Sequence, residues 1–184
     1  MKHLKYILTI FAFGILSFST IDPNDFEFSY PKRNKTTITS KLDNFKNFDK
    51  EWRGTDYYYY GISTDSIICS VLYYKLNKDE QKQYVDIFGG MTNAGIPFAY
   101  FSENSNLKKY ETNVENWGKM TDDFMFRQND ITEYEGIKIR QKHMYAYTMF
   151  DKDLFVIVHL SKTNYSSFDS TTMRTILDNF KKKN

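Results

Sequence analysis

His143 and His159 are the two side chains of this sequence whose type and spacing could do chemistry. They lie on the two arms of a predicted hairpin whose turn falls at residues 151–153. If all three turn residues form the loop, the histidines share one face as diagonal neighbours, roughly 7–8 Å apart along the backbone. A two-residue loop would turn them to opposite faces. In the first register they could form part of a metal or acid/base site.

We interpret both histidines as structural or surface residues, because a zinc site normally has at least three protein ligands and the spacing fixes no third one. The acidic pair Asp151 and Asp153 suits a hairpin turn better than a metal, since Asp is a favoured turn residue. Cys69, the single cysteine, is expected to pack as a small buried hydrophobe. The sequence therefore predicts no catalytic, cofactor-binding or metal-binding residue and no cofactor.

Two further patterns have structural interpretations. The glycine-rich stretch at residues 89–95 follows a predicted helix, whereas a phosphate-binding loop should follow a strand and open a helix. The four tyrosines at residues 57–60 would place two rings on each face of a strand. Exposed aromatic rings do anchor partners, but such tyrosines more often cover the edge of a core while their hydroxyls stay hydrated. We favour the second interpretation.

The elements that must position these side chains are mostly strands. Alternation of apolar and polar residues over 26–30 predicts a first strand. Residues 57–60 and 66–75 form a predicted hairpin around turn residues 61–65, and residues 136–150 and 154–162 form a second, longer hairpin. Further strands are expected over residues 98–101, 107–114 and 124–126.

Helices are expected at three places. Leu42, Phe45, Phe48 and Trp52 have spacings that a loose helix could bring to one side. Asn77 and Glu80 resemble a capping box, which predicts a helix that ends at the glycines of residues 89–90.

The last predicted helix has an apolar stripe that faces the core, formed by Met173, Ile176, Leu177 and Phe180. We expect Asp169 to cap it, Phe168 to staple to Met173, and the lysines at residues 181–183 to suit the negative end of its dipole.

Apolar side chains on both faces of the strand at 154–160 determine the expected fold class, because a strand that is apolar on both faces needs cover on both. The sequence therefore predicts an α+β fold: a three-layer α/β/α sandwich around a central antiparallel sheet. The chain should divide into a signal peptide at residues 1–19 and a single domain at residues 20–184.

The signal peptide is expected from Lys2 and Lys5, the apolar run at residues 6–18 and the small residues near Ser19. The run is too short to span a bilayer, which takes roughly 20 apolar residues. We therefore predict cleavage near Ser19/Thr20, a periplasmic or secreted product, and no stable membrane anchor after processing.

Loss of Lys2 and Lys5 reduces the 25 basic residues to 23, against 23 acidic ones. The processed chain then has no net charge. A nucleic-acid-binding protein would normally carry a basic surplus on one face, so no nucleic-acid partner is predicted.

The order of elements resembles the PsbP/Mog1-like fold. The resemblance is carried by residues 26–31, the hairpin at residues 145–160 and the closing segment at residues 173–180. Families with that fold include photosystem accessory proteins, a nuclear-transport regulator and exported bacterial proteins of unassigned role. The resemblance implies a binding or accessory module more than a catalyst.

From these observations we expect an exported, non-enzymatic binding or accessory protein that recognises a protein partner or a cell-envelope component. The alternative is a small-molecule-binding or metal-binding protein, or an enzyme, with a pocket between sheet and helix and with the histidines and nearby tyrosines as polar groups. A purely structural secreted protein is a third possibility.

Overall fold

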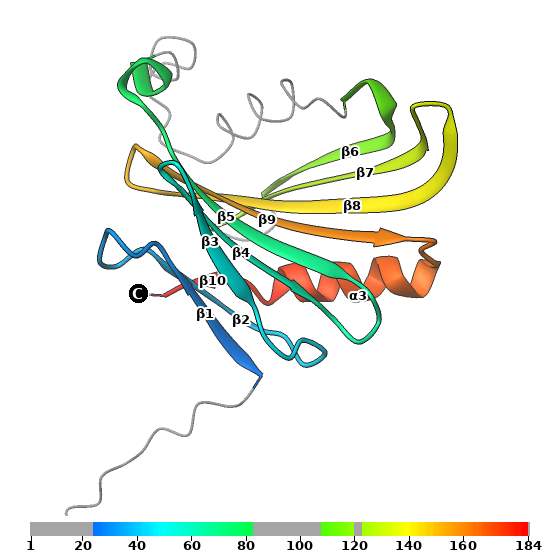
Figure 1. The fold of residues 1–184 in the computed structure, drawn as a ribbon, viewed down its shortest axis with the longest axis horizontal. Helices are drawn as coiled ribbons and strands as arrows, with labels where there is room; N and C mark the ends of the chain where they lie inside the picture. Colours follow the sequence, from blue (N-terminus) through cyan, green and yellow to red (C-terminus); the bar gives the residue numbers. More distant parts are fainter. Residues whose placement is uncertain (1–23, 83–107, 120–122, 184) are drawn as a thin grey trace, which may run out of the picture.

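The computed structural model describes residues 24–82, 108–119 and 123–183. In this part the chain forms two antiparallel sheets, and the helix α3 lies beside them (Figure 1). The smaller sheet has the order β1-β2-β10 and contains β1 (Asp25–Ser29), β2 (Thr37–Lys41) and β10 (Lys181–Lys182). The short 3₁₀-helix η1 (Lys108–Tyr110) precedes the last strands of the larger sheet.

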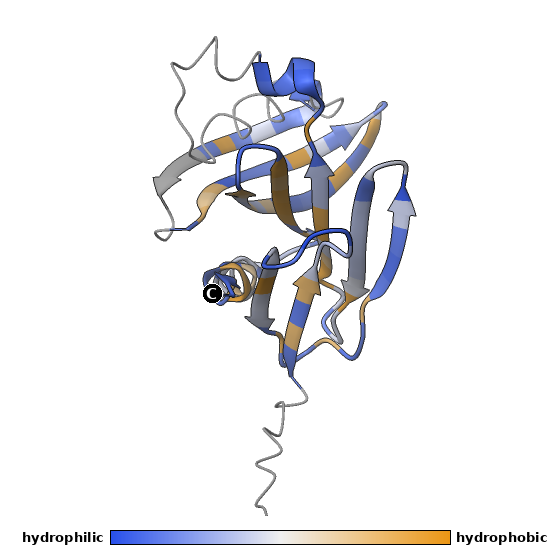
Figure 2. Ribbon diagram, turned by 90° about the vertical axis from the view of Figure 1, so that its left-hand side faces the viewer, coloured by the Kyte–Doolittle hydropathy of each residue, from blue (hydrophilic) through white to orange (hydrophobic). Residues whose placement is uncertain are grey.

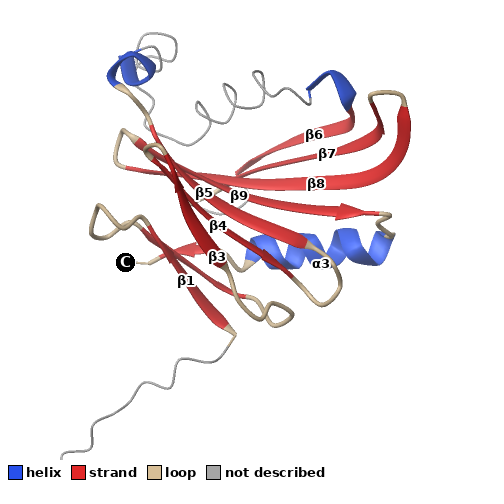
Figure 3. Ribbon diagram, viewed as in Figure 1, coloured by secondary structure: helices blue, strands red, loops and turns tan. Residues whose placement is uncertain are grey.

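The larger sheet has seven strands in the order β3-β4-β5-β9-β8-β7-β6, and every neighbouring pair is antiparallel. Its strands are β3 (Asp49–Arg53), β4 (Asp56–Ile62), β5 (Ile68–Lys75), β6 (Glu111–Lys119), β7 (Met125–Tyr134), β8 (Ile137–Phe150) and β9 (Leu154–Thr163). The helix α3 (Ser167–Asp178) follows β9 and runs below the sheet beside the smaller one (Figure 3).

One face of the larger sheet packs against the smaller sheet and α3. Hydrophobic and hydrophilic residues alternate along several strands, as expected for a sheet with one buried face (Figure 2). On this core face Val71, Val156 and Val158 are fully buried together with Ile38 of β2 and Leu177 of α3. We call this side the first face of the sheet and the opposite side the second face.

Two tyrosine hydroxyls join the sheets. Tyr73 of β5 donates to the carbonyl oxygen of Phe28 at 2.6 Å. The Tyr59 hydroxyl donates to the carbonyl of Ser29 at 2.8 Å and accepts from its amide at 3.0 Å. The tyrosine hydroxyls thus satisfy polar backbone groups of β1 that would otherwise be costly to bury.

The expected three-layer α/β/α sandwich is wrong: the chain is mostly strand, and the cover of the first face is a second sheet together with a single helix. In the described part α3 is the only α-helix whose two ends are both seen. The expected helix around Leu42 to Trp52 does not form. Phe45 instead makes an isolated bridge to Ser63, and Trp52 belongs to strand β3.

The strand predictions are largely confirmed. The first strand and both hairpins form, and Phe150 lies opposite Leu154. Gly61, expected in a turn, lies inside β4 opposite Cys69. A Cβ atom at this position would lie 2.8 Å from the Asn47 carbonyl oxygen. Glycine therefore allows the backbone at Asn47 to pass close to β4. The strand predicted at 107–114 divides into η1 and the start of β6.

The helix ends were predicted with mixed success. The capping box at Asn77 and Glu80 is confirmed, since each side chain accepts from the other's backbone amide. The cap of α3 is Ser166 and not Asp169, which is the reciprocal partner of Ser166. Phe168 is 77% exposed and does not staple to Met173, and the terminal lysines form β10 instead of ending the helix.

No helix among the described residues is long and apolar enough to cross a membrane. The predicted signal peptide, the glycine-rich stretch at 89–95 and the strand at 98–101 lie outside the described residues.

Candidate functional site

The structure settles the register of the two histidines. Residues 151–153 form the loop between β8 and β9, so His143 faces Ser161 while Tyr145 faces His159. The histidines are therefore diagonal neighbours on the second face of the sheet, as the three-residue loop predicts.

The two imidazoles are bonded to each other. His143 Nδ1 lies 2.9 Å from His159 Nε2, and the rings are nearly parallel, with 3° between their planes. The Tyr145 ring stacks on His159 with 4.4 Å between centroids. One neutral imidazole donates and the other accepts in such a bond, so each ring orients its partner.

A buried ion pair lies in the same region of the second face. The Arg127 guanidinium binds both carboxylate oxygens of Glu111, and its Nη1 also donates to Asn129 Oδ1 at 2.8 Å. The register places Asn129 opposite His143 and Arg127 opposite Tyr145. No pattern in the sequence had pointed to Glu111, Arg127 or Asn129. Arg127 and Asn129 are two residues apart on β7, so strand alternation places them on one face. The position of Glu111 could not be predicted from spacing, because the pairing of β6 with β7 is irregular.

Burial keeps the histidines neutral. It lowers the pKa of His143 to about 4, against the opposing effect of the Glu111 carboxylate. Burial, reinforced by His143, lowers the pKa of His159 to about 3. At neutral pH both rings are uncharged, and the ion pair adds no net charge to the cluster.

The geometry of this cluster does not favour catalysis or metal binding. Among the described residues, His143 Nε2, Arg127 Nε and Asn129 Nδ2 are buried away from solvent and have no hydrogen-bond partner. The described residues contain no group of three side chains that could hold a metal ion. The two rings are instead buried and bonded to each other.

The other candidates from the sequence also have structural roles. The Asp153 carboxylate accepts hydrogen bonds from Nη1 and Nη2 of Arg33, at 2.6 and 2.7 Å, and Asp151 accepts one from Nη1 at 3.2 Å. This confirms the interpretation of the acidic pair as part of a turn, which it ties to the β1–β2 loop. Cys69 is fully buried, and burial raises the pKa of its thiol. The cysteine is therefore unsuited to act as a nucleophile.

The tyrosine run divides between the two faces as predicted. Tyr57 and Tyr59 pack at the core, whereas Tyr60 is 44% exposed on the second face. The Tyr59 hydroxyl is bonded to the backbone of Ser29 and is not merely hydrated.

The described residues also form a surface groove, which we call the α3 groove. It lies between one side of α3 and the segment that follows β2, with a volume of about 300 Å³. Its lining consists of Lys41, Leu42, Asp43, Asn44, Phe45, Phe168, Thr171, Thr172, Thr175, Ile176 and Asn179. A pocket between sheet and helix was one expectation from the sequence, but none of these residues was predicted as a site.

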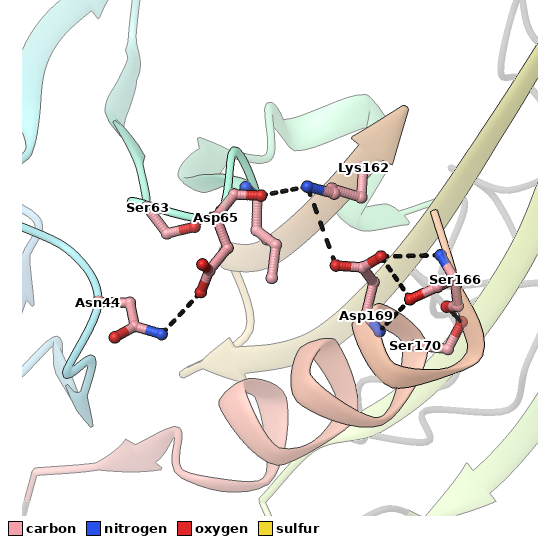
Figure 4. Close-up of polar contacts among 8 residues, drawn as sticks. Asn44, Ser63, Asp65, Lys162, Ser166, Asp169 and Ser170 are labelled. Atoms are coloured by element: carbon pink, nitrogen blue, oxygen red, sulfur yellow. Dashed lines mark hydrogen bonds and ion pairs between the residues drawn. The ribbon is translucent and has the colours of Figure 1, made fainter. Parts of the chain in front are cut away.

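Both walls of the α3 groove are anchored (Figure 4). The Asn44 side chain donates to the Asp65 carboxylate at 2.9 Å, and the main-chain carbonyl of Asn44 accepts from the Thr64 amide at 2.9 Å. On the helix side, Ser166 and Asp169 form the capping box, and Lys162 lies between Asp65 and Asp169. The groove is therefore formed before any partner arrives, which lowers the ordering cost of binding.

No protein-family model, curated protein or solved structure matches this chain. The assignment of function therefore depends on the described geometry.

Proposed function

We propose that this protein is an exported, non-enzymatic binding protein that recognises a partner protein through the α3 groove. The observation that carries the proposal is Phe168, a large apolar side chain that is 77% exposed at the edge of a concave surface. Leaving such a ring in water forfeits the free energy of burying it, roughly 1.5–3 kcal/mol. A partner that covers Phe168 would recover that free energy.

The burial of neighbouring apolar residues supports this proposal. Leu42, Phe45 and Ile176 form an apolar floor and are 1%, 4% and 9% exposed. Phe168 projects from the first turn of α3 beside that floor. A fixed apolar pocket with an exposed aromatic at its edge is the arrangement in which interface hot spots concentrate.

Ile137→Ser provides a matched control for Phe168→Ser. Ile137 is also a large exposed apolar residue, at 66%, but it begins β8 and does not line the groove. Both substitutions remove exposed apolar surface, so neither should change the melting temperature by more than about 2 °C.

The test is a comparison of three immobilised proteins, the wild type and the two variants, in extract from the cell envelope of the source organism. We expect one protein to be retained by the wild type and by Ile137→Ser, with at least tenfold less retained by Phe168→Ser. Equal retention by all three, or repeated recovery of the bare wild-type protein, would contradict the proposal. Mass spectrometry of the exported wild type tests cleavage near Ser19/Thr20 in the same preparation.

A further inference from the structure

The strand β3 forms one edge of the larger sheet. In the described part of the chain it pairs only with β4, through a hairpin whose two turn residues are Gly54 and Thr55. Gly54 has a φ of 65°, as expected for the first position of a type II′ hairpin turn. Four of the five residues of β3 are exposed, so a further strand has access to this edge.

The hairpin turn determines which backbone groups of β3 point outward. The residues that flank a two-residue turn, here Arg53 and Asp56, form a hydrogen-bonded pair. Bonded and non-bonded pairs alternate along an antiparallel ladder, so every second residue from Arg53 bonds to β4. Lys50 and Trp52 lie between these residues. Their amide and carbonyl groups point away from β4 and are the groups that a further strand would bind.

The residues of β3 are self-complementary when two copies pair antiparallel with Glu51 at the centre. In that register Lys50 of each copy lies opposite Trp52 of the other, and each such pair exchanges two backbone hydrogen bonds. Asp49 of each copy lies opposite Arg53 of the other in a non-hydrogen-bonded pair, where the side chains are closest. Opposite charges at such positions stabilise the pairing of strands.

The two central Glu51 side chains are the like-charged pair of this register. Each is bonded to Arg53 of its own strand, with 2.6 Å between Arg53 Nε and Glu51 Oε1, and Arg53 also lies over the Tyr58 ring at 4.5 Å. The guanidinium would therefore lie between Glu51 of its own copy and Asp49 of the other. A register centred on Lys50 would place Lys50 opposite itself and Asp49 opposite Glu51, which brings only like charges together.

A register centred on Trp52 uses less of the edge. It would bring Glu51 opposite Arg53, but Lys50 would face Gly54 of the turn instead of a strand residue. Only the central Trp52 pair would then exchange backbone hydrogen bonds. The register centred on Glu51 therefore satisfies more of the outward backbone groups.

We infer that β3 pairs with β3 of a second copy of this chain in the register centred on Glu51, which joins the larger sheets of two copies at their edges. A five-residue edge is small beside the roughly 800 Å² that each protein buries in a stable interface, so the dimer should be weak. The inference concerns a different surface from the α3 groove and does not depend on the proposed function.

Exchange of the two charges tests the inference by sedimentation equilibrium at high protein concentration. Asp49→Lys places cations opposite each other, and Arg53→Glu places anions opposite each other. We expect each single variant to dimerise at least tenfold more weakly than the wild type. The double variant restores both pairs and should dimerise within about threefold of the wild type.

Ile137→Ser is the control, since Ile137 begins β8 and lies outside β3, and it should dimerise as the wild type does. A monomeric wild type would overturn the inference. Single variants that dimerise as well as the wild type, or a double variant as weak as the single ones, would also overturn it.

Single cysteines test the register. Glu51→Cys places two thiols directly opposite each other at a Cα separation of about 4.5 Å, within the range of a disulfide. Trp52→Cys places them diagonally at about 7–8 Å, beyond that range. Cys69 is fully buried, so the wild type gives the background. We expect at least tenfold more disulfide-linked dimer from Glu51→Cys, and an equal or higher yield from Trp52→Cys would overturn the register.

Discussion

At the scale of single residues, the histidine pair shows how a suggestive spacing becomes a structural element. His143 and His159 satisfy one nitrogen each through a 2.9 Å contact, and stacking by Tyr145 fixes their planes. The sequence could predict their common face because strand alternation has a period of two. Their burial could not be predicted, since it depends on neighbouring strands that are far apart in sequence.

The two histidines make the protein sensitive to acid. Their pKa values lie below the unfolded value of about 6.5. Between that value and the folded values the unfolded chain binds more protons, so stability is full above about pH 6.5 and falls as the pH is lowered. We expect a loss on the order of 2–4 kcal/mol at pH 5 from this pair, measured by urea unfolding between pH 8 and pH 4.5.

The control is the double variant His143→Gln and His159→Gln. Its free energy of unfolding should lack the histidine-dependent decrease between pH 6.5 and pH 5. His3 is the only other histidine of the sequence, so the ring resonances of the pair can be followed directly. Titration of either ring near pH 6.5 in the folded protein would show that the pair is not held neutral.

At the scale of elements, sequence reasoning succeeded where the signal was local. The long hairpin, the first strand and the Asn77–Glu80 box depend on residues within one turn or one pair of strands. It failed where tertiary contacts decide: the apolar spacing of Leu42, Phe45 and Phe48 is compatible with a helix. In the folded chain Phe45 and Phe48 pack into the core from a non-helical segment.

Gly61 illustrates such a tertiary contact and gives a prediction. Gly61→Ala should lower the free energy of unfolding by about 1–3 kcal/mol, because the new Cβ atom meets the Asn47 carbonyl at 2.8 Å and the Phe48 ring at 3.1 Å. The measurement is chemical denaturation. Ile62→Ala on the same strand, where the side chain is 63% exposed, should change stability by less than about 0.5 kcal/mol. Equal effects of the two substitutions would mean that the backbone at Asn47 does not lie close to Gly61.

At the scale of the whole molecule, the two sheets share one core. Phe28 of β1 contacts Phe48, Tyr59 and Phe180, with centroid distances of 4.9, 5.2 and 5.9 Å. The two-sided apolar pattern of β9 predicted helical layers over both faces, whereas the first face is covered by the smaller sheet and α3. It did not specify a sheet as that cover, because β1, β2 and β10 come from opposite ends of the chain.

Phe28→Ala should therefore destabilise both sheets together, by about 3–5 kcal/mol. We expect a single thermal transition at a lower temperature, with loss of structure in β2 and β5 at the same point. Val114→Ala, at a site that is 44% exposed on β6, should have little effect. Two separate transitions would show that the smaller sheet folds independently.

The most direct test of the central claim, that the α3 groove contacts a partner protein, is site-specific photocrosslinking. A benzophenone amino acid would replace Thr171, an exposed residue of the groove, or Val114 and Ile137 outside it. After irradiation in the cell envelope, we expect a crosslinked partner protein from position 171 and none from positions 114 and 137. Crosslinks of equal yield at all three positions, or only outside the groove, would contradict the account.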